Sequence, residues 1–282
     1  MIIDSHSHIW QGQGEKIPAY LSALKTGGVD VSVVLVLETW AREVAPGNTW
    51  RGASNEEVGA IAAQYPDRLV LFGTVPPQLD DASDRLEDLV KRLPVKGLKL
   101  HPAIQGFDPT NPQVVRFVRK AADLGLPMVI HAGNVGWVGR LAYNDPYYLD
   151  DLATNVPQAQ IIVAHGGASE LVPWIVKRHP NMRMDTAYAP NWPTLPPFHW
   201  RFQCVDEDIV DFLGPEKILY GTDINPDVMA HPTQVRGRSD FADLYDVSAI
   251  VRAGIDEIRK LRISDEAKEL ILGGNARQML GI

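Results

Sequence analysis

The sequence predicts an α/β fold, a (β/α)8 barrel of the TIM-barrel type that forms one domain over residues 1–282. Short, continuously apolar runs recur along the chain, as expected of parallel strands buried on both faces. Helical patterns lie between these runs, and the length suits one such barrel. A doubly wound open sheet is the structural alternative, because local patterns do not distinguish the two closures. Its dinucleotide-binding version is disfavoured, since no Gly-x-Gly-x-x-Gly motif opens a helix after a strand.

Eight runs rich in β-branched residues are the expected strands. In chain order they are Ile2–His8, Val31–Glu38, Leu69–Val75, Val95–His101, Pro127–His131, Gln160–His165, Met182–Thr186 and Ile218–Asp223. Between them, Ser54 opens a capping box and Asn111 precedes a proline at a first helical position. Further helices are expected at Asp80–Leu93, Asp145–Thr154, Ser169–Arg178, Asp206–Leu213, Val247–Leu261 and Asp265–Leu272.

Three long irregular segments, Thr39–Ala53, Ala187–Phe202 and Ile224–Asp246, interrupt the alternation. Loops of this length usually cover a site or mediate contacts. The first one carries Trp40 and Trp50, so we expect aromatic side chains to line a pocket for a small ligand.

Composition narrows the range of partners. The chain has 27 basic and 35 acidic residues and no basic cluster, so nucleic acid and anionic membranes are poor candidates. Its single cysteine, Cys204, excludes an internal disulfide framework and suits a reducing compartment. We find neither a signal peptide nor a run of about 20 apolar residues. A soluble cytoplasmic protein with a small-molecule substrate is therefore expected.

Polar residues follow the apolar part of several predicted strands. In the first strand Asp4, His6 and His8 alternate, so we expect them on one face, with the two imidazoles about 7 Å apart and able to reach one metal ion. Later strands finish on Lys99 and His101, His131, His165 and Asp223. The carboxyl ends of barrel strands meet at one mouth, which predicts that these side chains converge there.

Six segments carry a resemblance to a known family. They are Asp4–His8, Gly97–Pro102, Val129–Gly133, Val163–Gly167, Tyr220–Asp223 and Ile271–Arg277. In their order and spacing the chain resembles the amidohydrolase superfamily. It is similar in particular to the branch with aminocarboxymuconate-semialdehyde decarboxylase and resorcylate decarboxylase, from end to end.

The resemblance implies a divalent metal ion held by His6, His8, His131 and Asp223. His165 would lie beside it, as a ligand of a second metal ion or as a group that orients substrate and water. Relatives with two metal ions use a carboxylated lysine or a glutamate on the fourth strand as a bridge. Lys99 is a candidate for that role, but we rank binding of a substrate carboxylate above it. His101, on the same strand face, is a further candidate catalytic residue.

Imidazoles and a carboxylate suit Zn²⁺, Mn²⁺ or Fe²⁺, and we expect zinc first, with one or two ions per chain. Such an ion would activate water at neutral pH. Asp223 would then serve as ligand and proton acceptor, and His165 would stabilise the developing oxyanion. Hydrolysis of a small organic acid, amide or lactone is the first prediction.

Three alternatives remain open. The first is non-oxidative decarboxylation of a small aromatic carboxylic acid. The second is oxygenation by a dinuclear iron or manganese site, because the scaffold does not fix the chemistry. The third is a non-catalytic subunit that partners an active homologue in a hetero-oligomer. A homo-oligomer is the expected assembly, since relatives commonly dimerise or form larger assemblies.

Overall fold

The computed structural model describes residues 1–38, 52–133, 140–187, 205–226 and 246–282. Most of the three long predicted loops, together with Trp40 and Trp50, lies outside the described residues. Among the described helices, none has the length and apolar character needed to cross a membrane.

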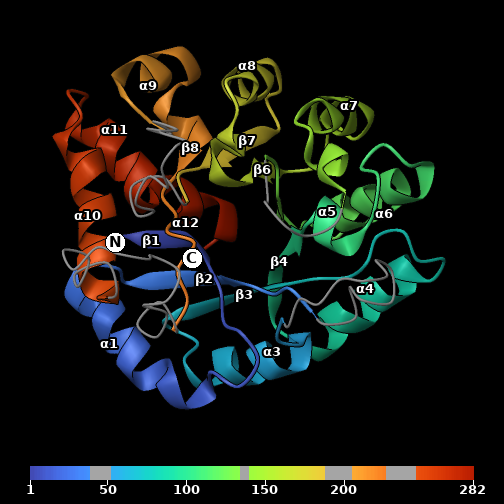
Figure 1. The fold of residues 1–282 in the computed structure, drawn as a ribbon, viewed down its shortest axis with the longest axis horizontal. Coiled ribbons are helices and arrows are strands. Elements are labelled where there is room, and N and C mark those ends of the chain that lie inside the picture. Colours follow the sequence, from blue (N-terminus) through green and yellow to red (C-terminus); the bar gives the residue numbers. More distant parts are fainter. Residues whose placement is uncertain (39–51, 134–139, 188–204, 227–245) are drawn as a thin grey trace, which may run out of the picture.

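Eight parallel strands form a ring in the order of the chain, and each strand pairs with the next (Figure 1). They are β1 (Ile3–Ser7), β2 (Val31–Leu35), β3 (Leu69–Gly73), β4 (Val95–Leu100), β5 (Met128–Ile130), β6 (Ile161–Val163), β7 (Met182–Asp185) and β8 (Ile218–Leu219).

Hydrogen bonds nearly close the ring between its first and last strands. The backbone N–H of Ser5 donates to the carbonyl of Tyr220 at 2.9 Å, and that of His8 donates to Ile224 at 2.8 Å. A sequential order with this closure is a (β/α)8 barrel, so the predicted fold is confirmed and the open doubly wound sheet is excluded.

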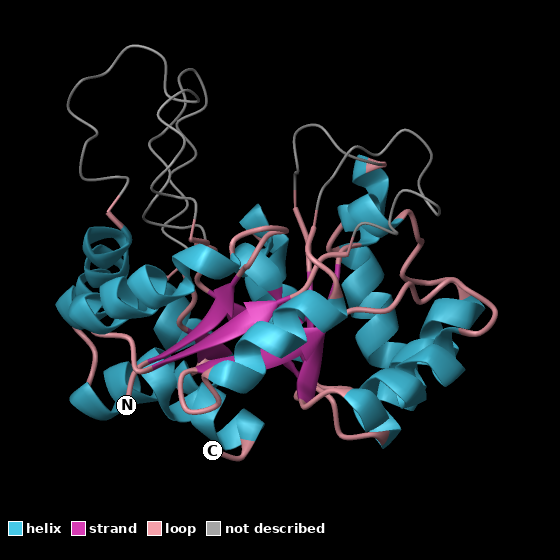
Figure 2. Ribbon diagram, turned by 90° about the horizontal axis from the view of Figure 1, so that it is seen from below, coloured by secondary structure: helices cyan, strands magenta, loops and turns pink. Residues whose placement is uncertain are grey.

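Helices surround the ring (Figures 1 and 2). They are α1 (Ile17–Gly27), α3 (Asn55–Gln64), α4 (Ala82–Arg92), α5 (Pro102–Gln105), α6 (Pro112–Asp123), α7 (Tyr147–Asn155), α8 (Leu171–Arg178), α9 (Glu207–Leu213), α10 (Val247–Lys260), α11 (Asp265–Glu269) and α12 (Asn275–Leu280). The predicted start signals are confirmed: Ser54 Oγ accepts the backbone N–H of Glu57 at 3.0 Å, and Asn111 Oδ1 accepts that of Gln113 at 2.9 Å.

The interior of the barrel is apolar below its mouth. Its buried cluster comprises Ile3, Val31, Val33, Leu35, Val70, Phe72, Val129, Ile162, Ala164, Leu219, Ala276 and Leu280. The last two come from α12, which contacts β1 and β8. Asn275 anchors this helix, because its side-chain amide donates to the carbonyls of Pro215 and Ile218 at 2.7 and 2.8 Å. The closing segment seen in the sequence therefore helps to fill the barrel.

The first strand departs from regular alternation. Its register with β2 shifts between Asp4 and Ser7. The Asp4 carboxylate accepts the backbone N–H of His6 at 3.1 Å and the Thr222 hydroxyl at 2.7 Å, and it lies 3.5 Å from Ser32 Oγ. Ser32 alternates with residues of the interior cluster and so lies on the outer face of β2. The expectation that Asp4 shares a face with His6 and His8 is therefore wrong, because regular alternation was assumed across this irregularity.

Candidate metal centre

The predicted site residues lie at the carboxyl ends of the strands, although most strands are shorter than predicted. His6 and Lys99 are within β1 and β4. Five others come after the strand ends: His8, His101, His131, His165 and Asp223. Each of these five residues lies where the chain leaves the β-sheet. The direction of its side chain therefore depends on the conformation of the following loop as well as on the strand.

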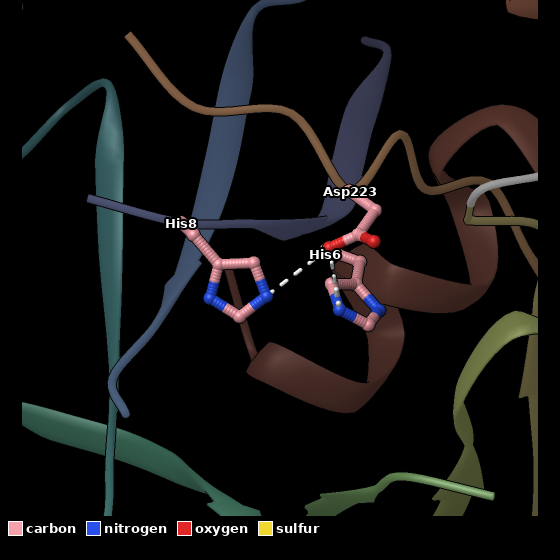
Figure 3. A group of neighbouring side chains, drawn as sticks. All are labelled: His6, His8 and Asp223. Atoms are coloured by element: carbon pink, nitrogen blue, oxygen red, sulfur yellow. Dashed lines mark ion pairs between the residues drawn. The ribbon is translucent and has the colours of Figure 1, made fainter. Parts of the chain in front are cut away.

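The Asp223 carboxylate faces the rings of both His6 and His8 (Figure 3). Its Oδ1 atom is 3.2 Å from His8 Nε2 and 3.5 Å from His6 Nε2. Two ligands bound at about 2.0–2.1 Å in tetrahedral geometry are roughly 3.3 Å apart, so these separations fit a shared ion. His6 is fully buried and the Asp223 side chain is 21% exposed, which leaves the group accessible from one side.

The hydrogen bond at the far side of His8 determines which ring nitrogen faces the site. His8 Nδ1 is 2.8 Å from the carbonyl of Leu35. A carbonyl only accepts, so a neutral His8 carries its proton on Nδ1 and presents a lone pair at Nε2. This lone pair and the Asp223 carboxylate are both acceptors, and a cation between them satisfies both. Trp10 stacks on the same ring, with centroids 4.6 Å apart.

His131 and His165 form a second part of the site. His165 Nε2 is 3.1 Å from His131 Nδ1, and the His165 ring centroid is 4.8 Å from that of His6. His131 Nε2 is buried and has no hydrogen-bond partner among the described residues. Such an orphaned nitrogen requires an explanation, and a bound cation provides one. Within the described chain, however, His131 does not join the compact group formed by His6, His8 and Asp223.

Lys99 and His101 are also brought to the site. Lys99 Nζ lies 3.4 Å from His6 Nε2, and the His101 ring stacks on His131 with centroids 3.9 Å apart. A buried polar network supports this segment: Thr74 Oγ1 donates to the Lys99 carbonyl at 2.7 Å, and Gln105 Oε1 accepts the His101 N–H at 2.8 Å. The side-chain amide of Gln105 also donates a hydrogen bond to Thr74 Oγ1 at 2.8 Å. This network holds the backbone of Lys99 and His101 in place.

Two site residues adopt a left-handed backbone conformation. Among the described non-glycine residues, only His165 and Asp223 have positive φ, at 62° and 59°. This conformation is strained for residues with a Cβ, and such strain persists where the surroundings over-determine it. For Asp223 the support includes its N–H, which donates to the His6 carbonyl at 2.7 Å.

Burial sets the charge state of the site. It lowers the pKa of His6, His101 and His131 well below the usual histidine value, and that of His165 to about 4. Burial alone would raise the pKa of Asp223, but the close contacts of its carboxylate with His8 and His6 outweigh burial and lower the pKa. Neutral imidazoles beside an ionised carboxylate are the form in which these groups bind metals.

Asp185, the last residue of β7, is a site residue that the sequence reasoning missed. Its carboxylate contacts His6 Nδ1 at 2.8 Å, and its ligand atoms lie within 4.8 Å of those of His6 and His165. The signal was present, because Asp185 lies near the carboxyl end of a predicted strand, as the other site residues do.

Comparison with protein families identifies this architecture. A family model described as amidohydrolase matches residues 3–282, which is nearly the whole chain. The chain belongs to the amidohydrolase family. It is therefore a metal-dependent hydrolase or carboxy-lyase, and the predicted resemblance is confirmed.

Solved structures with the same fold extend over the whole chain. A TIM-barrel protein from Bordetella bronchiseptica superimposes with a TM-score of 0.71 at 17% identity, covering 99% of this chain and 98% of that one. A probable 2-pyrone-4,6-dicarboxylic acid hydrolase from Acinetobacter baumannii, with citric acid bound, gives 0.64 at 16% identity, covering 100% and 99%. A 5-carboxyvanillate decarboxylase from Novosphingobium aromaticivorans, complexed with manganese and a nitrobenzoic acid, gives 0.64 at 14%, covering 100% and 96%.

Proposed function

We propose that this amidohydrolase is a metal-dependent hydrolase that acts on a small organic acid, amide or lactone through an activated water. The main support is the position of Asp223 Oδ1, which is 3.2 and 3.5 Å from the Nε2 atoms of His8 and His6. These are ligand-to-ligand separations of a tetrahedral site, formed by residues from the two ends of the barrel sequence. In this proposal residues 1–282 act as one catalytic domain.

The proposed ligands are His6, His8, His131 and Asp223, with His165 as a ligand of a second ion or as an orienting group. The orphaned Nε2 of His131 supports its inclusion. A set of imidazole and carboxylate ligands suits zinc, which we propose first, or manganese or iron, with one or two ions per chain.

When bound, a divalent ion lowers the pKa of water from 15.7 towards about 7 and so supplies hydroxide at neutral pH. In the proposed reaction Asp223 accepts the proton of this water and passes it to the leaving group. Because its Oδ1 faces both histidines, the proposal gives this proton to Oδ2. His165 stabilises the negative charge that develops on the attacked carbonyl oxygen.

Lys99 is the proposed binding group for a substrate carboxylate. Burial lowers the pKa of its amine to about 8, so it remains mainly an ammonium group at pH 7. Its Nζ points at His6 Nε2, the atom that the proposal gives to the metal ion, so it must turn to another acceptor when the ion binds. A substrate carboxylate is such an acceptor. His101, braced beside it, is the proposed hydrogen-bond partner for the same substrate.

The test is a substrate panel on protein loaded with zinc, manganese or iron in turn. Lactones and amides that carry a carboxylate are followed by proton release, and hydrolysis products are identified by mass spectrometry. The hydrolase proposal expects turnover of at least one lactone or amide and none by metal-free protein. If every loaded form leaves all lactones and amides intact, hydrolysis is wrong. Size-exclusion chromatography of the same samples tests the predicted homo-oligomer.

Decarboxylation of a small aromatic acid is the second candidate. It is favoured by the buried ammonium group of Lys99 beside the ligand cluster, and by the likeness to 5-carboxyvanillate decarboxylase. Carbon dioxide release from hydroxybenzoic acids separates it from hydrolysis. Repeating these assays without O₂ tests the dinuclear oxygenase alternative. A metal-free, inactive chain that binds a homologous partner would instead support the non-catalytic subunit.

A further inference from the structure

The buried carboxylate of Asp185 connects two of the candidate metal-binding histidines. Its Oδ2 lies 2.8 Å from Nδ1 of His6, a residue 179 positions away in the chain. Its Oδ1 accepts the backbone N–H groups of His165 and Ala187, at 2.7 and 3.1 Å. Three groups on two sides therefore fix the orientation of this carboxylate.

A neutral His6 ring carries one proton, and the neighbours of its two nitrogens place that proton on Nδ1. The 2.8 Å contact of Nδ1 with Asp185 has the length of a charge-assisted hydrogen bond, in which the carboxylate accepts. At the other nitrogen, Lys99 Nζ lies 3.4 Å away, and an ammonium group only donates. Asp223 Oδ1 faces the same nitrogen at 3.5 Å, too far for a good hydrogen bond.

We propose that Asp185 is a positioning residue that sets the Nδ1–H tautomer of His6 and thereby presents the Nε2 lone pair to a metal ion. The inference rests on the proposed function in one respect, the assignment of His6 as a ligand. The same carboxylate also supports the left-handed backbone of His165 through its N–H. One side chain thus prepares two separate parts of the site.

His8 provides an internal comparison. Its Nδ1 faces the carbonyl of Leu35, which performs for His8 the function that Asp185 performs for His6. The two histidines of the His-x-His segment are therefore oriented by different acceptors. The acceptor of His6 is a side chain and can be replaced by substitution, whereas the acceptor of His8 is a backbone carbonyl and stays in place.

The substitution Asp185→Asn tests the proposal because its amide has one favourable orientation. The backbone N–H groups of His165 and Ala187 require an oxygen at the Oδ1 position. The NH₂ group must then face His6 Nδ1, where it donates a hydrogen bond and forces the ring proton onto Nε2. The variant keeps the size and the backbone contacts of Asp185, yet blocks the nitrogen that the metal ion needs.

The first measurement is ¹⁵N NMR of histidine-labelled, metal-free protein, which distinguishes the two ring tautomers. We expect Nδ1–H for both His6 and His8 in the wild type. In D185N we expect Nε2–H for His6 and no change for His8. Titration with Zn²⁺ alone should show affinity reduced about 10- to 100-fold, the usual effect of removing a partner that orients a ligand. Asp4→Asn is the matched control, because Asp4 is a buried carboxylate that accepts the backbone N–H of His6 and, among the described residues, contacts no imidazole.

An Nε2–H ring at His6 in the wild type overturns the proposal, and this result does not depend on whether D185N folds. So does D185N protein with an unchanged His6 tautomer, whatever its zinc affinity. If that affinity falls while the tautomer stays, Asp185 acts as a direct ligand instead. The NMR measurement uses metal-free protein, so a failure of the hydrolase proposal in the substrate panel leaves the tautomer result standing.

Discussion

The two ends of the barrel interior are built from the same strands but from opposite kinds of side chain. Below the mouth, Phe72 belongs to an apolar cluster that also includes Ala276 and Leu280 of α12. At the carboxyl ends, the buried groups are His6 and Lys99 and their polar neighbours. One end contributes hydrophobic stabilisation, and the other end holds polar groups whose burial costs free energy unless they are paired.

The difference shows how the fold separates stability from chemistry. The polar end keeps its groups paired by contacts across the barrel, such as that of Asp185 with His6 at 2.8 Å. Substitutions at the polar end should therefore change metal binding and turnover more than folding. Substitutions in the apolar cluster should change the stability of the fold more than metal binding and turnover.

The largest expected effect follows from removing both histidines of the segment that begins the barrel, His6 and His8. In the double variant His6→Ala and His8→Ala, two of the proposed ligand atoms near Asp223 are lost, so tight metal binding should be abolished. Elemental analysis of protein purified with zinc measures this. His179→Ala is the matched control, because His179 pairs with Asp150 at 2.6 Å, outside the site, and should leave metal content unchanged. Stoichiometric metal in the double variant would contradict the ligand assignment.

A smaller but still large effect is expected on turnover from Asp223→Asn. Asparagine tolerates the left-handed backbone found here, so the loop should keep its shape. The amide cannot act as the proton acceptor, and kcat should fall by about 10²- to 10⁴-fold with KM little changed. The measurement is steady-state kinetics on the substrate found in the panel, with metal content checked in parallel. Near-normal kcat would remove Asp223 as proton carrier.

Local patterns were sufficient to predict the strands and most of the residues at their carboxyl ends, whereas the closure of the sheet depends on hydrogen bonds between distant segments. Apolar runs identified the eight strands, and the capping signals at Ser54 and Asn111 identified two helix starts. The orientation of Asp4 was not predictable, because it depends on a register shift set by contacts with β2 and Thr222. The role of Asp185 also depends on a partner 179 residues away, which no local pattern reveals.

Glu38 is expected to make stability depend on pH. Burial raises the pKa of its carboxyl to about 7, although the N–H of Asn55 donates to it at 2.5 Å. Its pKa is higher in the folded than in the unfolded state, so its contribution to stability is fully present below the unfolded value of about 4.5 and is lost as pH rises through 7. Glu38→Gln keeps an oxygen for Asn55 and removes the titration.

Between pH 4.5 and 8 the free energy of unfolding of the wild type should therefore fall, relative to that of this variant, by no more than about 3 kcal/mol, at 1.36 kcal/mol per pKa unit. Urea unfolding at several pH values measures the difference. Glu266 is exposed, so Glu266→Gln is the control that shows the effect of removing a carboxylate that is not buried. A constant difference across this range would show that Glu38 ionises normally in the folded protein.

The smallest expected effect concerns the apolar layer directly below the polar groups. Gly97 lies two residues before Lys99 on β4, and a Cβ atom added there would overlap the Phe72 ring. Gly97→Ala should thus destabilise the barrel by about 1–3 kcal/mol through overpacking, while zinc affinity stays unchanged. Adding Phe72→Leu should recover part of this loss, because the two residues share one space and their effects are coupled. If Gly97→Ala instead weakened zinc binding without lowering stability, the separation between the two ends of the barrel would not hold at this layer.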